Sequence, residues 1–440
     1  MTRDEVISEV RNNNISVVKL WFTDIIGRLK GFSLRVEDLE RALDEGIGFD
    51  GSSVEGFVRI EESDLLARPD PNTFVILPED FCGIRTAVMI CDILYPDGTP
   101  FESDTRLVLK KTVEKARSMG FTHFYVGPEL EFFYFPSDSD PTPLDAGGYF
   151  DILPLDKSVA ARKETFSVLR NLGIEIEMTH HEVAKSQHEL DFQYDDALAM
   201  ADKLQLAKVI IKEIARKHGL YASFMPKPVF GENGSGLHIH QSLFTEEGNA
   251  FYNEEDKYNL SEVAKKYIAG LLTHCKEITA VTNQWVNSYK RLVPGYEAPA
   301  YISWGRKNRS ALVRVPAFKP HRKQACRIEY RAPDPACNPY LTFSVVLAAG
   351  LEGIKNNYKL IDPIELDIYT MSQRERDEKG IESLPDSLIT AVLEMENSKL
   401  VKETFGEPLF SKFIANKKSE WERYRVRVTD YELKVYFPML

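Results

Sequence analysis

Charged residues occupy every second position of several strand-like segments, and this alternation is the strongest constraint on the fold. In Pro128-Glu129-Leu130-Glu131-Phe132, two glutamates alternate with apolar residues. Because successive side chains of a β-strand point to opposite faces, both carboxylates lie on one face and the apolar side chains on the other. Three more segments follow the same rule: His238 is expected to share a face with His240 and Ser242, Arg327 with Glu329 and Arg331, and Glu189 is expected to face away from His188.

These polar faces can be interpreted in two ways. Alternating polar residues on a single strand are typical of a sheet face that is open to solvent. Charged groups that recur on four strands favour instead a shared cleft, since burying a charge is costly unless it is paired or binds metal. Carboxylates and imidazoles without nearby thiolates suit Mg²⁺ or Mn²⁺ better than zinc or an iron–sulfur cluster. The sequence therefore predicts a divalent-metal site between these strands.

Arginines are concentrated in the later part of the same region. Their planar guanidinium groups are the expected partners of carboxylates and phosphates. The five are Arg291, Arg309, Arg314, Arg327 and Arg331. Metal ions together with several arginines indicate phosphoryl transfer, in which positioning and charge neutralisation supply most of the catalysis. The sequence has no Walker-type loop and no dinucleotide fingerprint, and the glycines Gly231, Gly234 and Gly236 fit a simple chain reversal as well as a ligand-binding loop.

The composition argues against several other classes of protein. Lys and Arg number 55 against 67 Asp and Glu, and the net charge of −12 disfavours nucleic acid or an anionic membrane as a partner. The apolar stretch at 341–351 is too short to span a bilayer, and no signal-peptide core follows the N-terminus. The five cysteines are odd in number and lack metal-ligand spacing, which predicts reduced packing residues. We therefore expect a cytoplasmic protein.

The chain of 440 residues is long enough for two domains. Segments 17–22, 29–32 and 86–92 are predicted strands and 36–45 a short helix, while the turn-forming stretch 95–100 ends this region. Asp104 is a predicted N-cap of a helix that ends at Gly120, and a longer helix is predicted from Ala197 to His218. Strand-like segments lie between and after these helices, at 122–135, 174–178, 188–193, 237–243 and 326–331. The pattern predicts an α+β fold with domains at 1–100 and 101–440.

At this point the sequence resembles type I glutamine synthetase over nearly its whole length. The motifs that carry the resemblance are Phe49-Asp50-Gly51-Ser52-Ser53, Glu62-Ser63-Asp64, the segment from Asn233 to Ser242, the segment from Arg291 to Glu297, Asn308-Arg309-Ser310-Ala311, Arg327-Ile328-Glu329-Tyr330-Arg331 and Asn338-Pro339-Tyr340. Lys185-Ser186 departs from a Pro-Gly pair that is common in the family. The resemblance implies a β-grasp domain followed by a catalytic domain on a curved antiparallel sheet. It also implies a ligase that joins ammonia to glutamate with ATP, through γ-glutamyl phosphate.

The resemblance further implies a role for each motif residue. Two or more divalent ions per active site are expected, the first on Glu131, Glu182 and Glu189 and the second on Glu129, His238 and Glu329. Glutamate is expected to bind Asn233, Gly234, Arg291, Glu297, Arg309 and Arg331. ATP is expected to bind Glu177, His240, Ser242, Arg309, Arg314 and Arg327. In catalysis Asp50 is expected to take up ammonium, Glu297 to close over the acyl phosphate, and Arg309 to position the transferred phosphate.

Assembly and regulation are implied in the same way. The resemblance predicts a dodecamer of two hexameric rings, with Asp50 of one subunit reaching the catalytic domain of the next. Arg59 resembles the arginine that couples feedback inhibition to the active site in the α subtype, and the alternative is an exposed arginine without a specific role. Tyr369 lacks the surrounding residues of an adenylylation target, so no adenylylation is predicted. Nitrogen-regulatory proteins are candidate partners.

Two other functions stay open at this stage. A related ligase would attach a polyamine or methylamine to glutamate, but an anionic ammonium site at Asp50 suits free ammonia better. A catalytically silent regulatory homologue should have lost ligands, whereas every metal and phosphate position of the motifs is filled here.

Overall fold

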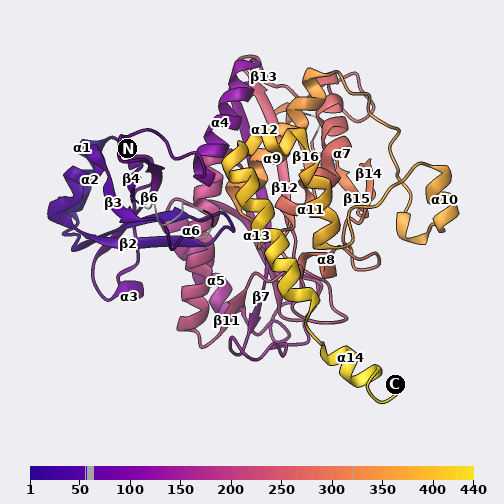
Figure 1. Ribbon diagram of the computed structural model, residues 1–440, viewed down its shortest axis with the longest axis horizontal. Helices are drawn as coiled ribbons and strands as arrows, with labels where there is room; N and C mark the ends of the chain where they lie inside the picture. Colours follow the sequence, from indigo (N-terminus) through magenta and orange to yellow (C-terminus); the bar gives the residue numbers. More distant parts are fainter. Residues whose placement is uncertain (55, 57–63, 320) are drawn as a thin grey trace.

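The computed structural model describes residues 1–54, 56, 64–319 and 321–440. Figure 1 shows a small N-terminal part beside a larger body, with the C-terminal helix projecting away from that body. Arg59, the predicted regulatory residue, lies outside the described residues, so its role stays a prediction.

The N-terminal part is a mixed sheet with short helices. Its elements are α1 (Arg3–Asn12), β1 (Val17–Thr23), β2 (Leu29–Arg35), η1 (Val36–Asp38), α2 (Leu39–Glu45), β3 (Ile47–Asp50), β4 (Asp64–Pro69), η3 (Pro71–Thr73), β5 (Val75–Ile76), α3 (Glu79–Cys82) and β6 (Thr86–Leu94). The strand order is β2-β1-β6-β4-β3, with β5 also paired to β6. β1 runs antiparallel to β2 and parallel to β6. This sheet has a hydrophobic core of its own, which includes Val18, Leu20, Ala42 and Met89.

The larger part is built on a curved mixed sheet with the strand order β14-β15-β16-β12-β7-β9-β8. Its strands are β7 (His123–Phe135), β8 (Ile176–His181), β9 (Gln187–Phe192), β10 (Asp195–Asp196), β11 (Tyr221–Ser223), β12 (Leu237–Thr245), β13 (Gly248–Asn249), β14 (Tyr301–Gly305), β15 (Ala311–Arg314) and β16 (Ile328–Tyr330). Among its described strand pairs, β14 and β15 run parallel at one edge and the others run antiparallel. Side-chain alternation is the same in both orientations, so the sequence could not predict this parallel pair.

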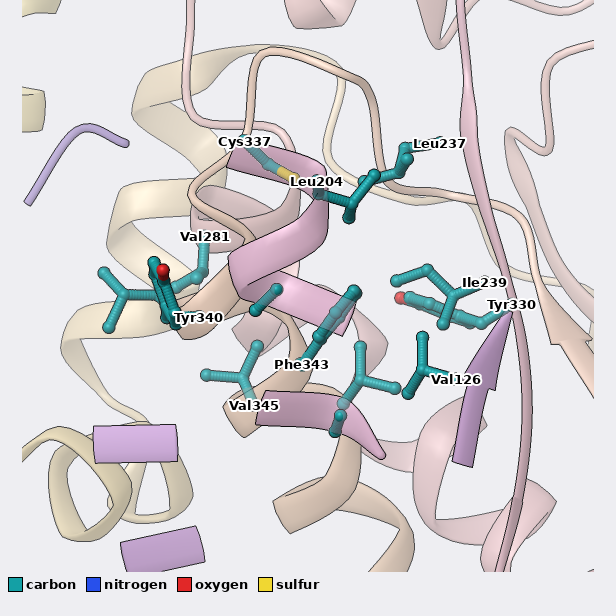
Figure 2. Close-up of a cluster of buried hydrophobic side chains, with 14 of the residues drawn as sticks. Val126, Leu204, Leu237, Ile239, Val281, Tyr330, Cys337, Tyr340, Phe343 and Val345 are labelled. Atoms are coloured by element: carbon teal, nitrogen blue, oxygen red, sulfur yellow. The ribbon is translucent and has the colours of Figure 1, made fainter. Parts of the chain in front are cut away.

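Helices cover one face of this sheet. The helices of this part are α4 (Thr105–Ser118), α5 (Val159–Asn171), α6 (Ala197–Lys217), α7 (Glu262–Thr282), α8 (Ser288–Arg291) and α9 (Pro339–Lys355), followed by η5 (Ile368–Thr370), α10 (Gln373–Glu378), α11 (Leu388–Glu396), α12 (Lys399–Phe405), α13 (Glu407–Arg425) and α14 (Asp430–Val435); η4 (Lys323–Ala325) precedes β16. Figure 2 shows Leu237 and Ile239 of β12 directed toward Leu204 of α6 and Phe343 of α9. All four side chains are fully buried. The apolar side of the alternating strands therefore faces the helices, and the polar side faces the other way.

α9 explains the long apolar stretch at 341–351. Nearly all of its residues are buried, so it is a core helix enclosed by other elements. Within the described residues, no helix combines the length and the apolar character needed to cross a bilayer.

A buried arginine connects the two parts of the molecule. Arg106 of α4 donates to Asp202 of α6 at 3.0 and 2.9 Å, to Asp92 of β6 at 2.6 Å and to Asp70 at 2.8 Å. Its side chain is 3% exposed. Three carboxylates around one guanidinium compensate its desolvation and fix the first helix after the predicted boundary against the N-terminal sheet. Asp104 caps α4 as predicted, by accepting from the Arg106 amide.

Candidate active site

The polar face of the sheet is assembled by strand register. His238 on β12 lies opposite Glu129 on β7, and Glu129 lies opposite Asp191 on β9. Two residues further along β7, Glu131 lies opposite Glu189 of β9. Residues two apart on one strand share a face, and directly opposed residues do too, so these five side chains meet on one surface. This agrees with the predicted alternation, in which the polar side chains of β7, β9 and β12 share one face.

The register extends the polar surface to β16 and β15. His240 lies opposite Glu329, and Glu329 lies opposite Arg314. Arg314 Nε donates to Glu329 in a short hydrogen bond, and Arg331 Nε lies 3.1 Å from Glu329 Oε1. Glu329 is therefore a buried carboxylate between two arginines at the border of the carboxylate group.

A cavity of about 300 Å³ opens over the carboxylates. The six residues predicted to hold metal and the six predicted to bind glutamate all line this cavity. They are Glu129, Glu131, Glu182, Glu189, His238 and Glu329, and Asn233, Gly234, Arg291, Glu297, Arg309 and Arg331. Residues from strands β7, β9, β12 and β16, from helix α8 and from the connecting loops thus converge on one space, although they are up to 202 positions apart along the chain (from 129 to 331).

A second, larger cavity of about 1020 Å³ adjoins the first. Five of the residues predicted to bind ATP line it, namely Glu177, His240, Ser242, Arg314 and Arg327. The sixth, Arg309, lines the first cavity. Glu129, Met178, Asp191 and Arg314 line both cavities, so the two spaces share a wall.

Glu129 is the centre of a hydrogen-bonded chain between the cavities. His238 Nδ1 lies 2.8 Å from Glu129 Oε2, and His240 Nε2 lies 2.7 Å from Glu129 Oε1. Arg327 Nε donates to His240 Nδ1 at 3.1 Å, which leaves the proton of neutral His240 on Nε2, where it can be donated to Glu129. Burial alone would raise the pKa of Glu129, but the hydrogen bonds from His238 and His240 outweigh burial and hold it well below its usual range.

The other carboxylates repel one another. Burial, and next the charge of Glu182, raise the pKa of Glu131 to about 8. Burial and the charges of Glu131 and Glu129 raise the pKa of Glu189 well above its ordinary value, and burial raises that of Asp191 to about 6. Asp191 Oδ1 is buried and has no hydrogen-bond partner among the described residues. A cluster of this kind is stabilised by cations, so the residues fit divalent metal ions, which favour carboxylate oxygens.

Two groups of side chains could each hold a metal ion, because within each group the candidate ligand atoms lie within 4.8 Å of one another. One consists of Glu129, His240 and Glu329, and the other of His180, Glu189 and Asp191. From the sequence, His240 is expected to bind ATP, and neither His180 nor Asp191 is expected in the site. Asp191 could have been found, because it shares a face with Glu189 two positions earlier. His180 could not, since the predicted strand ended at Met178 whereas β8 continues to His181.

Arg291 and Arg331, two of the arginines predicted to bind glutamate, differ in how many of their donors are already hydrogen-bonded. Arg291 Nη1 donates to the carbonyls of Ala332 and Pro333 at 2.7 and 3.1 Å, and its Nη2 donates to the Arg331 carbonyl at 3.2 Å. Arg331 Nη1 is buried without a hydrogen-bond partner in the described structure. Arg331 is thus the arginine with a donor available to an anionic ligand.

Glycine is required where the segment 234–236 approaches these side chains. A Cβ on Gly236 would lie 2.6 Å from Arg291 Nη2 and 2.8 Å from His238 Nε2. The Gly236 amide also donates to Glu131 Oε2 at 2.9 Å. The glycines predicted either to reverse the chain or to bind a ligand therefore let the backbone reach the polar cavity.

Two of the predicted catalytic residues lie at the edges of the site. Glu297 lines the first cavity, is exposed, and has a left-handed backbone with φ of 56°. Asp50 is exposed at the end of β3 in the N-terminal part and lines neither cavity of its own chain. Together, a carboxylate-rich cavity and an adjoining cavity with histidine and arginine indicate an enzyme that handles phosphate groups beside bound divalent metal.

Comparison with known proteins gives the family. The catalytic domain of glutamine synthetase matches residues 102–436, and its β-grasp domain matches residues 14–96. The glutamine synthetase of Mycolicibacterium smegmatis is 49% identical over 99% of both chains, and that of Methanosarcina mazei is 48% identical over 100% of this chain and 98% of the relative. A solved GmaS–ADP complex is 31% identical and covers 98% of this chain and 99% of its own, with a TM-score of 0.89.

The chain therefore belongs to the glutamine synthetase family. It is a ligase that forms a carbon–nitrogen bond between glutamate and ammonia.

Proposed function

We propose that this chain makes L-glutamine from L-glutamate, ammonia and ATP through γ-glutamyl phosphate, with the amino acid in the smaller cavity and the nucleotide in the larger one. The observation that carries this proposal is the separation of the lining residues into two joined cavities. Members of the family use ATP and divalent metal, and the related GmaS was solved with ADP. The finer assignment of residues to each ligand is our inference.

Divalent metal is proposed to bind the carboxylate cluster of the smaller cavity. Glu131, Glu182 and Glu189 would hold one ion and Glu129, His238 and Glu329 the other, with His180, Asp191 and His240 as further donors. Bound there, Mg²⁺ or Mn²⁺ would neutralise the negative charge that phosphate oxygens bring to the site. The mutual repulsion of Glu131 and Glu189 without metal supports this assignment.

Protein side chains would align the two substrates. Arg331, with its free Nη1, would bind the α-carboxylate of glutamate, helped by Asn233 and the Gly234 backbone. Arg314 and Arg327 would bind phosphate oxygens of ATP from the larger cavity. The γ-carboxylate oxygen of glutamate then attacks the terminal phosphorus of ATP near the shared wall, and ADP leaves. Arg309 would stabilise the charge of the transferred phosphoryl group.

The second step forms the amide. Asp50 would hold ammonium and take one of its protons, and the resulting ammonia attacks the acyl carbon of γ-glutamyl phosphate. The carbon–oxygen bond to phosphate breaks, and the nitrogen loses a second proton to the departing phosphate to give the neutral amide. Glu297 would cover the intermediate and exclude water, which would otherwise hydrolyse it.

We further propose a domain boundary near residue 100 and an oligomer with active sites between subunits, a dodecamer of two hexameric rings. The matched family ranges end at 96 and resume at 102, which supports the boundary. The position of Asp50 outside the cavities of its own chain supports a shared site. The C-terminal segment also exposes large apolar side chains that an assembly could cover, including Val428, Phe437 and Leu440 at 70%, 81% and 100% exposure.

The experiment that tests the reaction is phosphate release from ATP with Mg²⁺ and glutamate. We expect release to depend strongly on ammonium and to match glutamine formation. Replacing ammonium with methylamine, ethanolamine or putrescine is the control. Turnover only with a substituted amine would instead assign the chain to a γ-glutamyl-amine ligase, and the absence of turnover under every condition would favour a silent homologue.

A further inference from the structure

Residues 292–297, called here the flap loop, contact a lysine that has no role in the reaction scheme above. Lys227 Nζ lies 3.9 Å from the centroid of the Tyr296 ring. This is well within the distance at which an ammonium group is attracted to the face of an aromatic ring. Tyr296 precedes Glu297, and both line the smaller cavity. Lys227 is not among the described residues that line it.

Lys227 is itself held firmly. Its backbone amide donates to Asn287 Oδ1 at 2.7 Å, and Asn287 Nδ2 donates to the Lys227 carbonyl at 3.0 Å. Asn287 directly precedes α8, the short helix that leads into the flap loop. Lys227 Nζ also donates to the carbonyl of Glu232 in a short hydrogen bond. The lysine is therefore anchored to the base of the loop and reaches the ring near its tip.

The flap loop needs such a support. Glu297 has φ of 56° and Gly295 has φ of 94°, so the loop turns through the left-handed region twice. A non-glycine residue in this region is strained, and the strain persists only where neighbouring contacts hold the backbone. The Glu297 side chain is exposed and offers little packing of its own. Before Glu297, the Tyr296 ring contacts Lys227, and after it the Ala298 carbonyl accepts from the Tyr369 hydroxyl.

We propose that Lys227 is a positioning residue of the reaction, which holds Glu297 over the smaller cavity through the ring of Tyr296. The inference rests on the proposed function, in which Glu297 shields γ-glutamyl phosphate from water. When the contact is lost, water attacks the acyl phosphate, phosphate leaves, and glutamate is regenerated. ATP is then consumed without formation of glutamine.

A second link connects Lys227 to the turn between β8 and β9, on which the proposed metal ligand Glu182 lies. Lys185 Nζ lies 3.1 Å from Glu232 Oε1, and Lys185 sits between the proposed ligands Glu182 and Glu189. Glu232 thus binds Lys185 through its carboxylate and Lys227 through its carbonyl. The Lys185 side chain is 50% exposed, so solvent screens this ion pair and we expect it to contribute little to holding Lys227.

The test is the ratio of phosphate released to glutamine formed, measured on the full-length protein. We expect the Lys227→Met variant to raise this ratio several-fold over the wild-type ratio while the KM for ATP stays close to wild type. Tyr296→Leu should behave in the same way, and Tyr296→Phe, which keeps the ring face, should behave as wild type. The double variant Lys227→Met with Tyr296→Leu should be no worse than either single variant, because both remove one interaction.

The Lys257→Met variant is the matched control. Lys257 lies 5.1 Å from the Tyr258 ring, so this change removes another cation–π contact outside both cavities, and its ratio should stay at the wild-type value. An unchanged ratio in Lys227→Met, or an equal rise in Lys257→Met, would overturn the inference. If Lys227→Met fails to fold, the comparison of Tyr296→Leu with Tyr296→Phe decides the question. Wild-type protein without ammonium-dependent turnover would instead overturn the proposed function.

Discussion

His238 lies directly opposite Glu129 across the β7–β12 pair, and its Nδ1 is 2.8 Å from Glu129 Oε2. His240 reaches the other oxygen of the same carboxylate from the adjacent row. The carboxylate of Glu129 is therefore hydrogen-bonded by two imidazoles, one from each of the two cavities. The pairing fixes which ring nitrogen of each histidine faces Glu129: Nε2 of His238 is left on the far side of its ring, whereas Nδ1 of His240 accepts from Arg327.

Divalent metal should stabilise the protein more at pH 8 than at pH 6. The pKa of Glu131 is raised to about 8 in the folded protein without metal, above its value in the unfolded chain. The stability that this group contributes is therefore present at low pH and lost as the pH rises through about 8. Mg²⁺ binds the ionised form, so its increment in thermal midpoint should grow over this range.

Glu131→Gln provides the matched variant for that measurement. Without metal it should be more stable than wild type at pH 8, because a repelling carboxylate is gone. With Mg²⁺ it should lose most of the metal-induced rise. A wild-type rise that is equal at both pH values would contradict the proposed role of Glu131.

Arg331→Lys should weaken glutamate binding selectively. Lysine cannot reproduce the planar donors of Arg331, whose Nη1 has no hydrogen-bond partner among the described residues. Loss of a hydrogen bond to a charged group costs about 1.5–3 kcal/mol, so we expect the KM for glutamate to rise about 10- to 100-fold. Steady-state kinetics with each substrate varied in turn checks this, and the KM for ATP should change little. A comparable rise for both substrates would argue for a general distortion.

Asp104 should contribute a distinct pH dependence at the junction of the two parts. Burial, and next the charge of Asp92, raise its pKa to about 7. Because the folded pKa lies above the unfolded one, the contribution of Asp104 to the free energy of unfolding falls as the pH rises from about 4 to about 7. Chemical unfolding of wild type and Asp104→Asn across this range tests the idea.

The readout for Asp104→Asn is the slope of the unfolding free energy against pH, and not the absolute stability. The two carboxylate oxygens of Asp104 accept from the Ile93 and Arg106 amides, one each. Asparagine has a single side-chain oxygen and its NH₂ group cannot accept, so one of the two hydrogen bonds is lost and the variant is less stable overall. Its unfolding free energy should nevertheless fall less steeply with pH than that of wild type. Parallel curves would show that Asp104 stays ionised throughout.

Two inactive variants should restore activity when their subunits are mixed. Asp50→Ala removes the proposed ammonium residue from the N-terminal part, and Glu329→Ala removes a proposed metal ligand from the catalytic part. If each site combines these parts from neighbouring subunits, random mixing in equal amounts gives about a quarter of the sites with both residues intact. The assay is turnover after joint unfolding and reassembly. Turnover no higher than that of the separate variants would place Asp50 and Glu329 in independent sites.

The sequence predicted the strands and their faces well because both follow from local alternation. β1, β6 and β7 match their predicted segments within two residues, and α4 and α6 end near Gly120 and Gly219 as expected. Local patterns also explain the polar row on β7 and β12. They could not give the register between strands, which decides that Glu129 rather than Glu131 meets both histidines.

Residues on loops were harder to place. Arg309 lies between β14 and β15, where alternation gives no direction, and it lines the smaller cavity without reaching the larger one. Ser186 has φ of 63°, a conformation that a glycine would adopt more easily. Its hydroxyl accepts from the Leu144 amide and its own amide donates to Asp145 at 3.0 Å. Contacts from a distant loop therefore compensate the departure from the Pro-Gly pair, and no local signal predicts them.

The unequal size of the joined cavities has a consequence for inhibitor design. In the proposed assignment, a compound that mimics glutamate must fit a space of about 300 Å³ crowded with fixed charges, so additions to it are expected to abolish binding. The neighbouring space of about 1020 Å³ tolerates larger substituents. Larger substituents are therefore best placed in the proposed nucleotide cavity and linked, past Glu129 and Arg314, to a small and unmodified amino-acid group.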